Sequence, residues 1–342
     1  MLSMNLADRT HPRPPAWAQA LFASPLVAAG DAGDARMWAI EDPMSKATVT
    51  EQFTVHAGEY DNRYGHSEHF LRLFRTAFAA AGVALPACPT ILDLGSGSGV
   101  NSVLPCLELF DDPAIVATDL SPQLIGMLAR RIANHGRAAR VLPVVMDAMS
   151  DHVQPCRFDL VTGAAILHHL EEPERCLAAA LRALKPGGTA IFFEPFDGYC
   201  LLRLAHQRIL AESRHLPLNP VIAEVLSRMI ADTAARTRPD SSSAAWRGLD
   251  DKWLFSREYI ETAASAAGFA RVALVPHSDN SRLFRNFGNI QLGLATGRSD
   301  LAMPAWANGI LDEFDDAITA AGKRAMMLEG TVVLTRGPDL SL

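Results

Sequence analysis

From residue 90 to residue 195 the chain alternates short apolar runs with amphipathic segments, and this alternation limits its folds more than any other feature. The apolar runs have the length and composition of buried strands, and there are five: TILDLG (90–95), AIVATDL (114–120), VLPVVMD (141–147), FDLVTGA (158–164) and GTAIFFE (188–194). Between them, Ser121 followed by Pro122, and Pro173, are residue types that begin helices. Strands that alternate with helices form a parallel sheet covered by helices, so the sequence predicts an α/β fold.

The chain divides further by composition and by hydrophobic pattern. Residues 1–40 are rich in Ala, Pro and Gly and predict a flexible N-terminal arm, whereas apolar residues at helical spacing in residues 41–85 predict a helical cap. Residues 86–195 form the predicted core. Two amphipathic stretches in residues 196–250 predict a helical lid, and residues 251–342 complete the core with a last helix, two strands and a helical insertion.

Single residues locate several of these elements. Ser256 and Gly268 bound a predicted helix, and the apolar runs RVALVPH (271–277) and GTVVLTR (330–336) predict the last strands. Pro105 falls within the first crossover helix, which we expect it to kink or shorten because proline lacks the N–H group.

Charge and cysteine usage exclude several classes of protein. The net charge of -7 and the pI of about 5.9 argue against a surface that neutralises nucleic-acid phosphates. The five cysteines form no CxxC pair, which argues against a disulfide framework and predicts no metal site. No apolar run approaches the ~18 residues that cross a bilayer. The composition therefore predicts a cytoplasmic protein without nucleic-acid or membrane partners.

The stretch ILDLGSGSG carries the strongest chemical signal. It places Gly95, Gly97 and Gly99 between a strand and a helix, where glycine lets the backbone approach a ligand closely. The dinucleotide fingerprint GxGxxG requires a third glycine where this chain has Val100. Asp93 precedes the loop, where a carboxylate suits a ligand ammonium better than a pyrophosphate. The stretch therefore argues against a nicotinamide-dependent oxidoreductase.

Acidic residues also end the next two strands. Asp119 lies 24 residues after Gly95, at a position where a carboxylate can accept both hydroxyls of a ribose, and Asp147 ends the third strand. Any one of these acids could be a helix cap or a turn residue. Open α/β sheets bind ligands at the carboxyl ends of their strands, so acids after three consecutive strands together indicate a ligand site.

In these motifs the region from about 90 to 195 resembles the class I S-adenosylmethionine-dependent methyltransferases. The stretches that carry the resemblance are ILDLGSGSG, TDLSPQLIGML, VVMDAM, FDLVTGAAILHHLEEPE and LRALKPGGTAIFFEP. The resemblance implies a Rossmann-like, seven-stranded, mostly parallel sheet whose last strand is antiparallel, and S-adenosylmethionine as cofactor. The residues that it assigns to the cofactor are Asp93, Gly95, Gly97 and Gly99 for the methionine part, Asp119 and Leu120 for the ribose, Asp147 and Ala148 for the adenine, and Ala164 beside the sulfonium. Tyr60 or Tyr64, in the N-terminal cap, is expected to cover the cofactor.

The methyl acceptor is less clearly indicated. The fourth strand is not followed by the Asn/Asp-Pro-Pro-Tyr run that is typical of amino-group methylases of DNA and protein glutamine, which favours a small-molecule substrate. His168 and His169 are candidate general bases because histidine titrates near neutral pH. Glu194, at the end of the fifth strand, is a third candidate for binding or deprotonating the acceptor. Packing or capping by the histidines, and a hydrogen bond within the loop by Glu194, are the alternative roles.

The sequence thus predicts methyl transfer to the O, N or C atom of a small molecule, such as a specialised metabolite. The alternative is a protein of the same fold that binds S-adenosylmethionine without transferring its methyl group, for example a cyclase. The apolar helices of residues 196–250 predict either a wall of the acceptor pocket or the interface of a homodimer.

Overall fold

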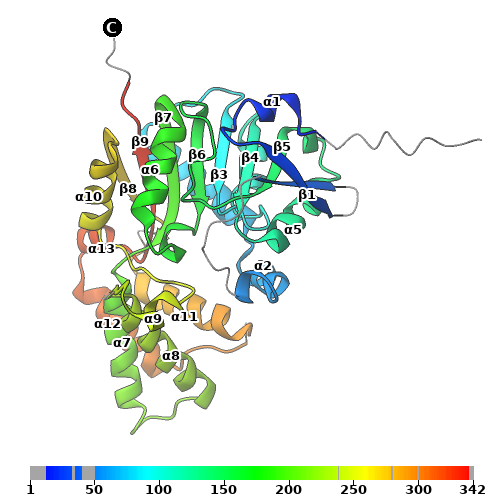
Figure 1. Ribbon diagram of the computed structural model, residues 1–342. Coiled ribbons are helices and arrows are strands. Elements are labelled where there is room, and N and C mark those ends of the chain that lie inside the picture. The colour runs from blue at the N-terminus through cyan, green and yellow to red at the C-terminus, as the bar shows by residue number, and fades with distance from the viewer. Residues whose placement is uncertain are drawn as a thin grey trace, which may run out of the picture.

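A computed structural model describes residues 13–32, 35–40, 51–237, 239–278, 280–298 and 300–338 of the chain. Its centre is one sheet of nine strands in the order β1-β2-β5-β4-β3-β6-β7-β9-β8, with helices on both faces (Figure 1). The strands are β1 (Leu26–Ala32), β2 (Ala35–Ile40), β3 (Thr90–Leu94), β4 (Ala114–Asp119), β5 (Val141–Val145), β6 (Phe158–Ala164), β7 (Leu184–Pro195), β8 (Arg271–Pro276) and β9 (Glu329–Thr335).

Seven of these strands, β5-β4-β3-β6-β7-β9-β8, form the predicted core sheet. The five from β3 to β7 are parallel, and β9 inserts antiparallel between β7 and β8. The predicted α/β class and the antiparallel strand are therefore confirmed. The expected total of seven strands is wrong, because β1 and β2 extend the sheet beyond β5.

The two added strands correct the prediction of a flexible arm for the described part of residues 1–40. β1 pairs antiparallel with β2, and β2 joins β5 in parallel through Trp38 opposite Val144. Leu26 and Trp38 are buried in the core beneath one face of the sheet. The run LVAAGDA of β1 has too many small residues for a clear strand pattern, so only the packing of these side chains reveals the hairpin.

The α-helices are α1 (Ala16–Gln19), α2 (Ala57–Tyr64), α3 (Ser67–Ala81), α4 (Val103–Leu109), α5 (Pro122–Ile132), α6 (Pro173–Ala183), α7 (Tyr199–Glu212), α8 (Pro220–Arg236), α9 (Ala244–Arg247), α10 (Arg257–Ala267), α11 (Leu283–Thr296), α12 (Ala305–Ala317) and α13 (Ala320–Met326). Short 3₁₀ turns lie at η1 (Glu51–Phe53), η2 (Ala138–Arg140) and η3 (Leu167–His169). Residues 41–50, the first part of the predicted cap, lie outside the described residues.

Successive strand residues point to opposite faces, so the sheet supports two cores. Leu92 and Leu94 of β3 join one core with side chains from α6 and α10, whereas Ile91 joins the other with side chains from α3, α4 and α5. The three-layer arrangement is the doubly wound architecture that alternating strands and helices predict.

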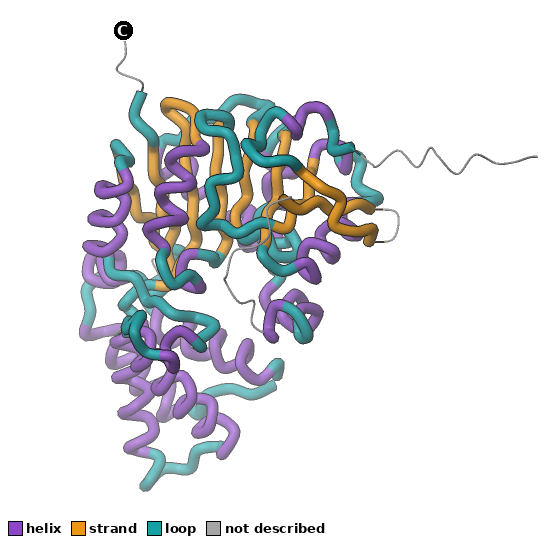
Figure 2. The backbone as a smooth tube through the Cα atoms, in the orientation of Figure 1, coloured by secondary structure: helices purple, strands orange, loops and turns teal. Residues whose placement is uncertain are grey.

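A third core lies apart from the sheet, where α7, α8, α11 and α12 pack together. Figure 2 shows these helices as a separate body beyond one end of the sheet. Leu226 of α8 and Leu311 of α12 are fully buried in this body. The apolar faces of the 196–250 insertion are therefore satisfied largely by α11 and α12, which are also insertions in the core pattern.

Helix termini follow the sequence signals closely. The Ser121 hydroxyl accepts a hydrogen bond from the Leu124 amide at 3.2 Å, and the Ser256 hydroxyl accepts one from Tyr259 at 3.0 Å, as N-caps do. Helix α4 begins only at Val103, so Pro105 lies in its first turn, where an N–H has no intrahelical acceptor. The prediction of a shortened helix is confirmed. Among the described residues, no helix has both the length and the apolar character needed to cross a membrane.

Candidate functional site

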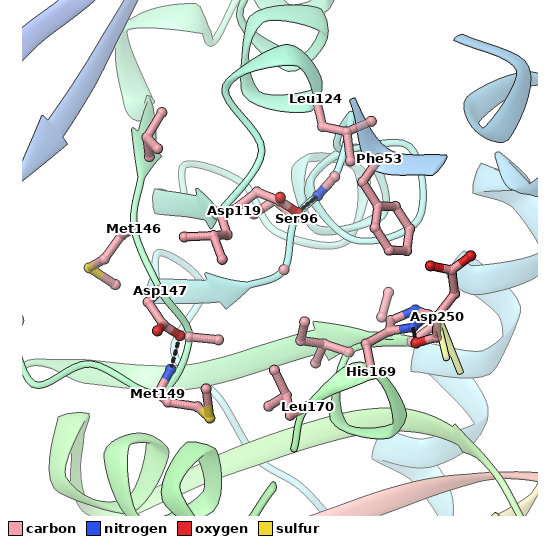
Figure 3. A pocket seen from close by; sticks show the side chains of 18 of the residues that line it. Phe53, Ser96, Asp119, Leu124, Met146, Asp147, Met149, His169, Leu170 and Asp250 are labelled. Atoms are coloured by element: carbon pink, nitrogen blue, oxygen red, sulfur yellow. Dashed lines mark hydrogen bonds between the residues drawn. The ribbon is translucent and has the colours of Figure 1, made fainter. Parts of the chain in front are cut away.

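A cavity of about 1030 Å³ opens at the carboxyl ends of the central strands. It lies where the strand order reverses between β3 and β6, the place where open α/β sheets bind ligands. Gly95 follows β3, Asp119 ends β4, Asp147 follows β5 and Ala164 ends β6, and all four residues line the cavity. Figure 3 shows part of this lining, with Asp147 and the methionine side chains across the cavity from His169.

The glycine-rich loop forms one wall through its backbone. Gly95, Gly97 and Gly99 have φ values of +65°, +53° and +80°, a region that side chains rarely adopt. Gly95 and Gly97 line the cavity, but Gly99 does not, because it packs beneath the loop. A Cβ atom on Gly99 would lie 2.4 Å from Leu128, so this glycine serves helix packing rather than ligand contact.

Asp93 lies below the loop and does not line the cavity. Its side chain is 1% exposed and accepts hydrogen bonds from the hydroxyls of Ser102, at 2.5 Å, and Thr162, at 2.7 Å. Burial raises the pKa of this carboxyl to about 6, and the two hydroxyls limit the rise. Asp93 thus ties β3 to β6 and to the start of α4, and it supports the loop from behind.

Asp119 faces the cavity from the end of β4. Its Oδ2 accepts a hydrogen bond from the Gly97 amide at 2.9 Å, and its Oδ1 accepts one from the Ser121 amide at 2.8 Å. Burial raises the pKa of this carboxyl, and the amide hydrogen bonds oppose the rise. Each oxygen retains a lone pair, so the side chain can accept two further hydrogen bonds from a ligand. The next residue, Leu120, also lines the cavity.

The wall after β5 is mainly apolar. Met146, Ala148 and Met149 line it together with Asp147. Asp147 Oδ1 accepts a hydrogen bond from the Met149 amide at 2.9 Å, which fixes the turn after β5 (Figure 3). A flat, largely apolar ligand group with a polar edge fits this wall.

An aromatic wall from the N-terminal cap closes another side of the cavity. Phe53, Tyr60 and Tyr64 line it, with ring centroids 5.1 Å apart for both Phe53–Tyr60 and Tyr60–Tyr64. Tyr64 is partly exposed, whereas burial, aided by the charges of Asp251 and Asp119, raises the pKa of Tyr60.

Arg131 of α5 links helix α2 to the glycine-rich loop, through an ion pair that the sequence did not predict. Arg131 Nη2 donates to Asp61 Oδ2 at 2.7 Å, and Arg131 Nη1 donates to the Ser98 carbonyl at 2.5 Å. The Ser98 hydroxyl also donates to Asp61. Nothing in the spacing of Asp61 and Arg131, which are 70 residues apart, indicates this contact.

The three predicted catalytic residues differ in whether they line the cavity. Glu194 is 2% exposed and His168 is 6% exposed, and neither lines the cavity. Glu194 accepts hydrogen bonds from the amides of Ile166, Leu167 and His168, and its Oε2 lies 2.6 Å from His168 Nδ1. Glu194 therefore holds the turn η3, which corresponds to the alternative role of a hydrogen bond within the loop.

His168 lies between two carboxylates. Although burial disfavours its charged form, Glu194 and Asp251 raise the pKa of His168 to about 9. Asp251 Oδ1 lies 3.5 Å from His168 Nε2. At neutral pH the ring is thus an imidazolium whose two N–H groups face the two acids.

His169, by contrast, lines the cavity. Its Nδ1 lies 2.9 Å from the Asp250 carbonyl oxygen, which can only accept, so Nδ1 carries the proton and donates. Burial, and then the positive charge of His168, lower the pKa of His169 to about 3. The ring is therefore neutral, and Nε2 retains a lone pair. Phe53 packs against this ring edge-on, with centroids 5.1 Å apart.

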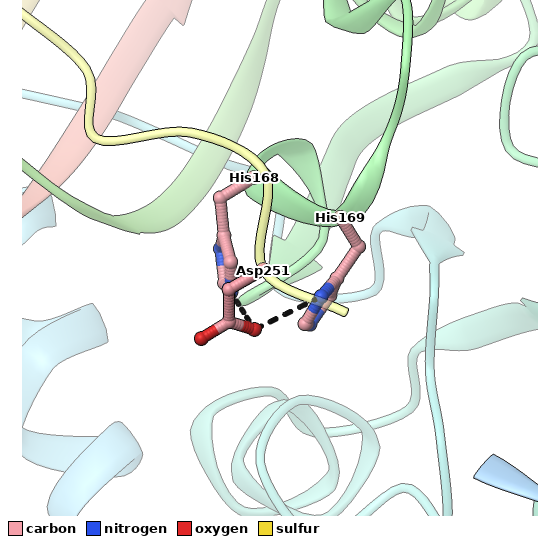
Figure 4. A group of neighbouring side chains, drawn as sticks. All are labelled: His168, His169 and Asp251. Atoms are coloured by element: carbon pink, nitrogen blue, oxygen red, sulfur yellow. Dashed lines mark ion pairs between the residues drawn. The ribbon is translucent and has the colours of Figure 1, made fainter. Parts of the chain in front are cut away.

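Asp251 faces both histidines (Figure 4) and also contacts the lid. Its Oδ1 lies 3.3 Å from His169 Nδ1, and its Oδ2 lies 3.4 Å from Arg236 Nη1 of α8. Hydrogen bonding to His168 and the nearby positive charges lower the pKa of Asp251 despite its burial. The sequence analysis missed Asp251 and Arg236, because only the return of the chain after the insertion brings them beside η3.

His168, His169 and Asp251 offer ligand atoms within 4.8 Å of one another, close enough for the three to contact one metal ion. The charges in this cluster are already paired among the side chains. Arg236 and protonated His168 face Asp251, and His168 also faces Glu194. The prediction of no metal at this site remains a prediction.

Only the end of the insertion reaches the cavity. Within the described part of residues 196–250, the lining residues are Arg247, Gly248 and Asp250, and neither α7 nor α8 contributes. Helices α7 and α8, for which a wall of the acceptor pocket was one of two predicted roles, therefore do not form that wall. Arg236 of α8 instead holds the chain that follows the insertion, since its Nη2 donates to the Trp253 carbonyl at 2.9 Å and its Nη1 faces Asp251.

Comparison with known proteins agrees with this geometry. The family model of the methyltransferase domain matches residues 91–188, which include the glycine-rich loop, Asp119 and Asp147. The chain is 29% identical over 144 residues to the ubiquinone biosynthesis O-methyltransferase of Methylococcus capsulatus, an alignment that covers 42% of this chain and 59% of that protein. It is also 29% identical over 149 residues to the malonyl-[acyl-carrier protein] O-methyltransferase of Hahella chejuensis, covering 43% and 50%.

These alignments span about half the length of the relatives. A solved structure with a similar fold is phosphoethanolamine N-methyltransferase 2 of Haemonchus contortus in complex with phosphomonomethylethanolamine and S-adenosylhomocysteine. The TM-score is 0.51 at 16% identity, and the match covers 87% of this chain and 62% of that one.

Proposed function

We propose that this chain, whose core is a class I S-adenosylmethionine-dependent methyltransferase domain, transfers a methyl group to a small-molecule acceptor bound in the same cavity. The observation that carries the proposal is the joint position of the glycine-rich loop, Asp119 and Asp147 around one cavity at the switch point of the sheet. The cavity has a volume of about 1030 Å³, which is at the upper end of the range for ligand pockets. It therefore has room for a cofactor and an acceptor.

The residues present fit the cofactor. Asp119 retains two lone pairs for the two hydroxyls of a ribose, and the wall of Met146, Ala148 and Met149 suits the adenine ring. Gly95 and Gly97 let the methionine part approach the backbone. Ala164 lines the cavity at the end of β6, in keeping with its expected place beside the sulfonium, and Tyr64 lies on the covering wall.

When bound, S-adenosylmethionine supplies the methyl group and the leaving group, so the protein has to position the acceptor and keep water out. We infer that His169 contacts the acceptor, because it is the member of the predicted catalytic set that lines the cavity. With Nδ1 donating to Asp250, Nε2 can accept a hydrogen bond from the attacking group and hold it in line. A low pKa makes His169 a weak base, which suits an acceptor that ionises readily.

Glu194, His168 and Asp251 then act as positioning residues. Glu194 fixes the backbone of η3 and the ring of His168, and Asp251 lies between the two histidine rings. This chain of contacts sets the orientation of His169 without touching the acceptor.

The charge of the chain favours a small molecule over a nucleic acid. The net charge is -7, which does not suit a surface that neutralises many phosphates at once. The curated relatives are named for O-methylation and the solved neighbour for N-methylation, and an acceptor screen with hydroxyl, amine and carbon nucleophiles identifies the atom that is methylated.

Isothermal titration with S-adenosylmethionine, S-adenosylhomocysteine and NAD tests the cofactor. We expect micromolar binding of the two adenosyl ligands and a loss of about 100-fold in Asp119→Ala, which removes two ribose hydrogen bonds. Asp111→Ala, an exposed acid far from the lining, is the matched control and should bind normally. Preferential binding of NAD would contradict the proposal.

Product analysis separates methyl transfer from the alternative of a cofactor-binding protein that transfers nothing. During an acceptor screen, methyl transfer forms one S-adenosylhomocysteine for each methylated product. A product that forms while S-adenosylmethionine stays intact would instead support the alternative.

A further inference from the structure

Lys252 is a buried positive charge for which the proposed methyl transfer has no use. It is 6% exposed and lines the cavity. Its backbone N–H donates to the His168 carbonyl at 2.7 Å, so it lies directly beside the turn that carries His169. Lys252 therefore lies on the same side of the cavity as His169, close to the place where an acceptor would react.

The ammonium group of Lys252 is only partly satisfied. It has three donors, and one of them bonds the Leu249 carbonyl. Among the residues that the structure describes, no carboxylate oxygen lies within 4.0 Å of Nζ, although Glu171, Asp250 and Asp251 attract it from a greater distance. Burial lowers the pKa of Lys252 in spite of these acids. A buried charge without a close partner is costly, and the cost is removed when a ligand brings the opposite charge.

From this arrangement we infer that the acceptor carries an anionic group, a carboxylate or a phosphate, and that Lys252 binds it. The inference rests on the proposed function, since it assigns a substrate class to the same cavity. Arg247, from the same segment of chain, also lines the cavity with an exposed side chain and adds positive charge at the rim.

Two anions could occupy this position: the acceptor's own group, or the carboxylate of the cofactor's methionine part. The site favours the acceptor. The methionine part is expected at Gly95 and Gly97, after β3, whereas Lys252 belongs to the segment 248–252 that packs against η3, after β6. The anion thus lies on the His169 side of the cavity.

Ligand binding to the full chain tests the inference with a matched pair of probes, 4-hydroxybenzoate and 4-hydroxybenzamide, whose rings suit the wall of Phe53, Tyr60 and Tyr64. In protein saturated with S-adenosylhomocysteine, we expect the acid to bind about tenfold or more tightly than the amide, the effect of a charge-assisted hydrogen bond. The ratio should fall to about one in Lys252→Met and be retained at least in part in Lys252→Arg. Lys185→Met, a lysine paired with Asp159 at the opposite end of the strands, is the control and should keep the ratio.

Equal binding of acid and amide to the unmodified protein, or an unchanged ratio in Lys252→Met, would overturn the inference. A tenfold loss of S-adenosylhomocysteine affinity in Lys252→Met would also overturn it, because the anion would then be the cofactor's carboxylate. Failure of the proposed function has a different signature: the unmodified protein would bind no S-adenosylhomocysteine. The acid-to-amide ratio can still be measured in that case, in the protein without cofactor.

Discussion

The two halves of the cavity are built in different ways. The cofactor half uses residues at the ends of β3, β4 and β5. Its strand-end acids that line the cavity, Asp119 and Asp147, are fixed by backbone amides a few residues away or on a neighbouring loop. The acceptor half is built around η3 and is fixed by side chains from distant parts of the chain, with Asp251 beside His168 and Arg236 of α8 beside Asp251.

This difference has a physical consequence. A site made of strand ends and backbone amides follows from the fold itself, so the same sheet can serve many enzymes. A site held by a buried charge cluster depends on partners whose removal leaves an uncompensated charge. We therefore expect changes in the cofactor half to act on ligand affinity, and changes in the acceptor half to act on stability and turnover.

Removal of Glu194 should give the largest effect. Glu194→Ala leaves the imidazolium of His168 and three backbone amides of η3 without their acceptor, so the free energy of unfolding should fall by about 3–5 kcal/mol. Urea unfolding followed by circular dichroism measures this loss, with Glu224→Ala, an exposed acid of α8, as the control. A loss below 1 kcal/mol would show that the cluster does not support the acceptor half.

A side chain at Gly95 should lower the affinity for the cofactor. In Gly95→Val the Cβ would lie 2.6 Å from Ile166, and the residue would have to adopt φ +65°. We expect affinity for S-adenosylhomocysteine to fall by about 1000-fold, or roughly 4 kcal/mol. Gly136→Val, in an exposed turn with open space around it, is the matched control for titration calorimetry. Unchanged affinity would contradict the assignment of this wall to the cofactor.

The charge cluster should also make stability depend on pH. Because the pKa of His168 is about 9 in the folded chain and about 6.5 when unfolded, its contribution is complete below pH 6.5 and is lost as the pH rises through 9. The difference corresponds to about 3 kcal/mol between pH 6 and pH 10. Urea unfolding at both pH values should show this extra loss in the native chain but not in His168→Gln. An identical pH dependence in the two proteins would contradict the charge state assigned to His168.

Removal of the His169 side chain should affect turnover alone. His169→Ala is expected to lower kcat by about 100-fold on the acceptor found by the screen, because the attacking group loses its hydrogen-bond partner. Affinity for S-adenosylhomocysteine should stay within twofold of that of the native chain. His215→Ala, an exposed histidine after α7, controls for general effects. A normal kcat in His169→Ala would leave the acceptor half without its proposed contact residue.

The smallest effect concerns metal ions. Since Arg236 and His168 already balance the charge of Asp251, treatment with a chelator should change the rate by less than twofold, and added Mg²⁺ or Zn²⁺ should not increase it. Restoration of a chelator-lost activity by one of these ions would show that His168, His169 and Asp251 are metal ligands.

The sequence predicted more of the cofactor half than of the acceptor half. Gly95, Gly97, Asp119 and Asp147 were placed together because the carboxyl ends of parallel strands meet at one edge. The predicted cofactor-binding residues also included Asp93 and Gly99, which support the loop from below and do not line the cavity. A motif gives the position of a residue along the chain but not the direction of its side chain.

In the acceptor half, the sequence named His168, His169 and Glu194 as equals, and only the structure distinguishes them. A 3₁₀ turn directs two consecutive side chains differently, so His169 reaches the cavity while His168 faces Glu194. Asp251 and Lys252 carried no signal at all, because their role arises only where the chain returns to η3 after the insertion.

What the sequence determined by itself is therefore the sheet, its parallel core and the edge where ligands bind, since hydrophobic period and glycine placement act locally. What the tertiary structure decided is the added hairpin of β1 and β2, the packing of the lid helices on α11 and α12, and the charge cluster behind His169. These depend on contacts between residues far apart in the chain, and the energy of a buried charge is set by its partners in space rather than by its neighbours in sequence.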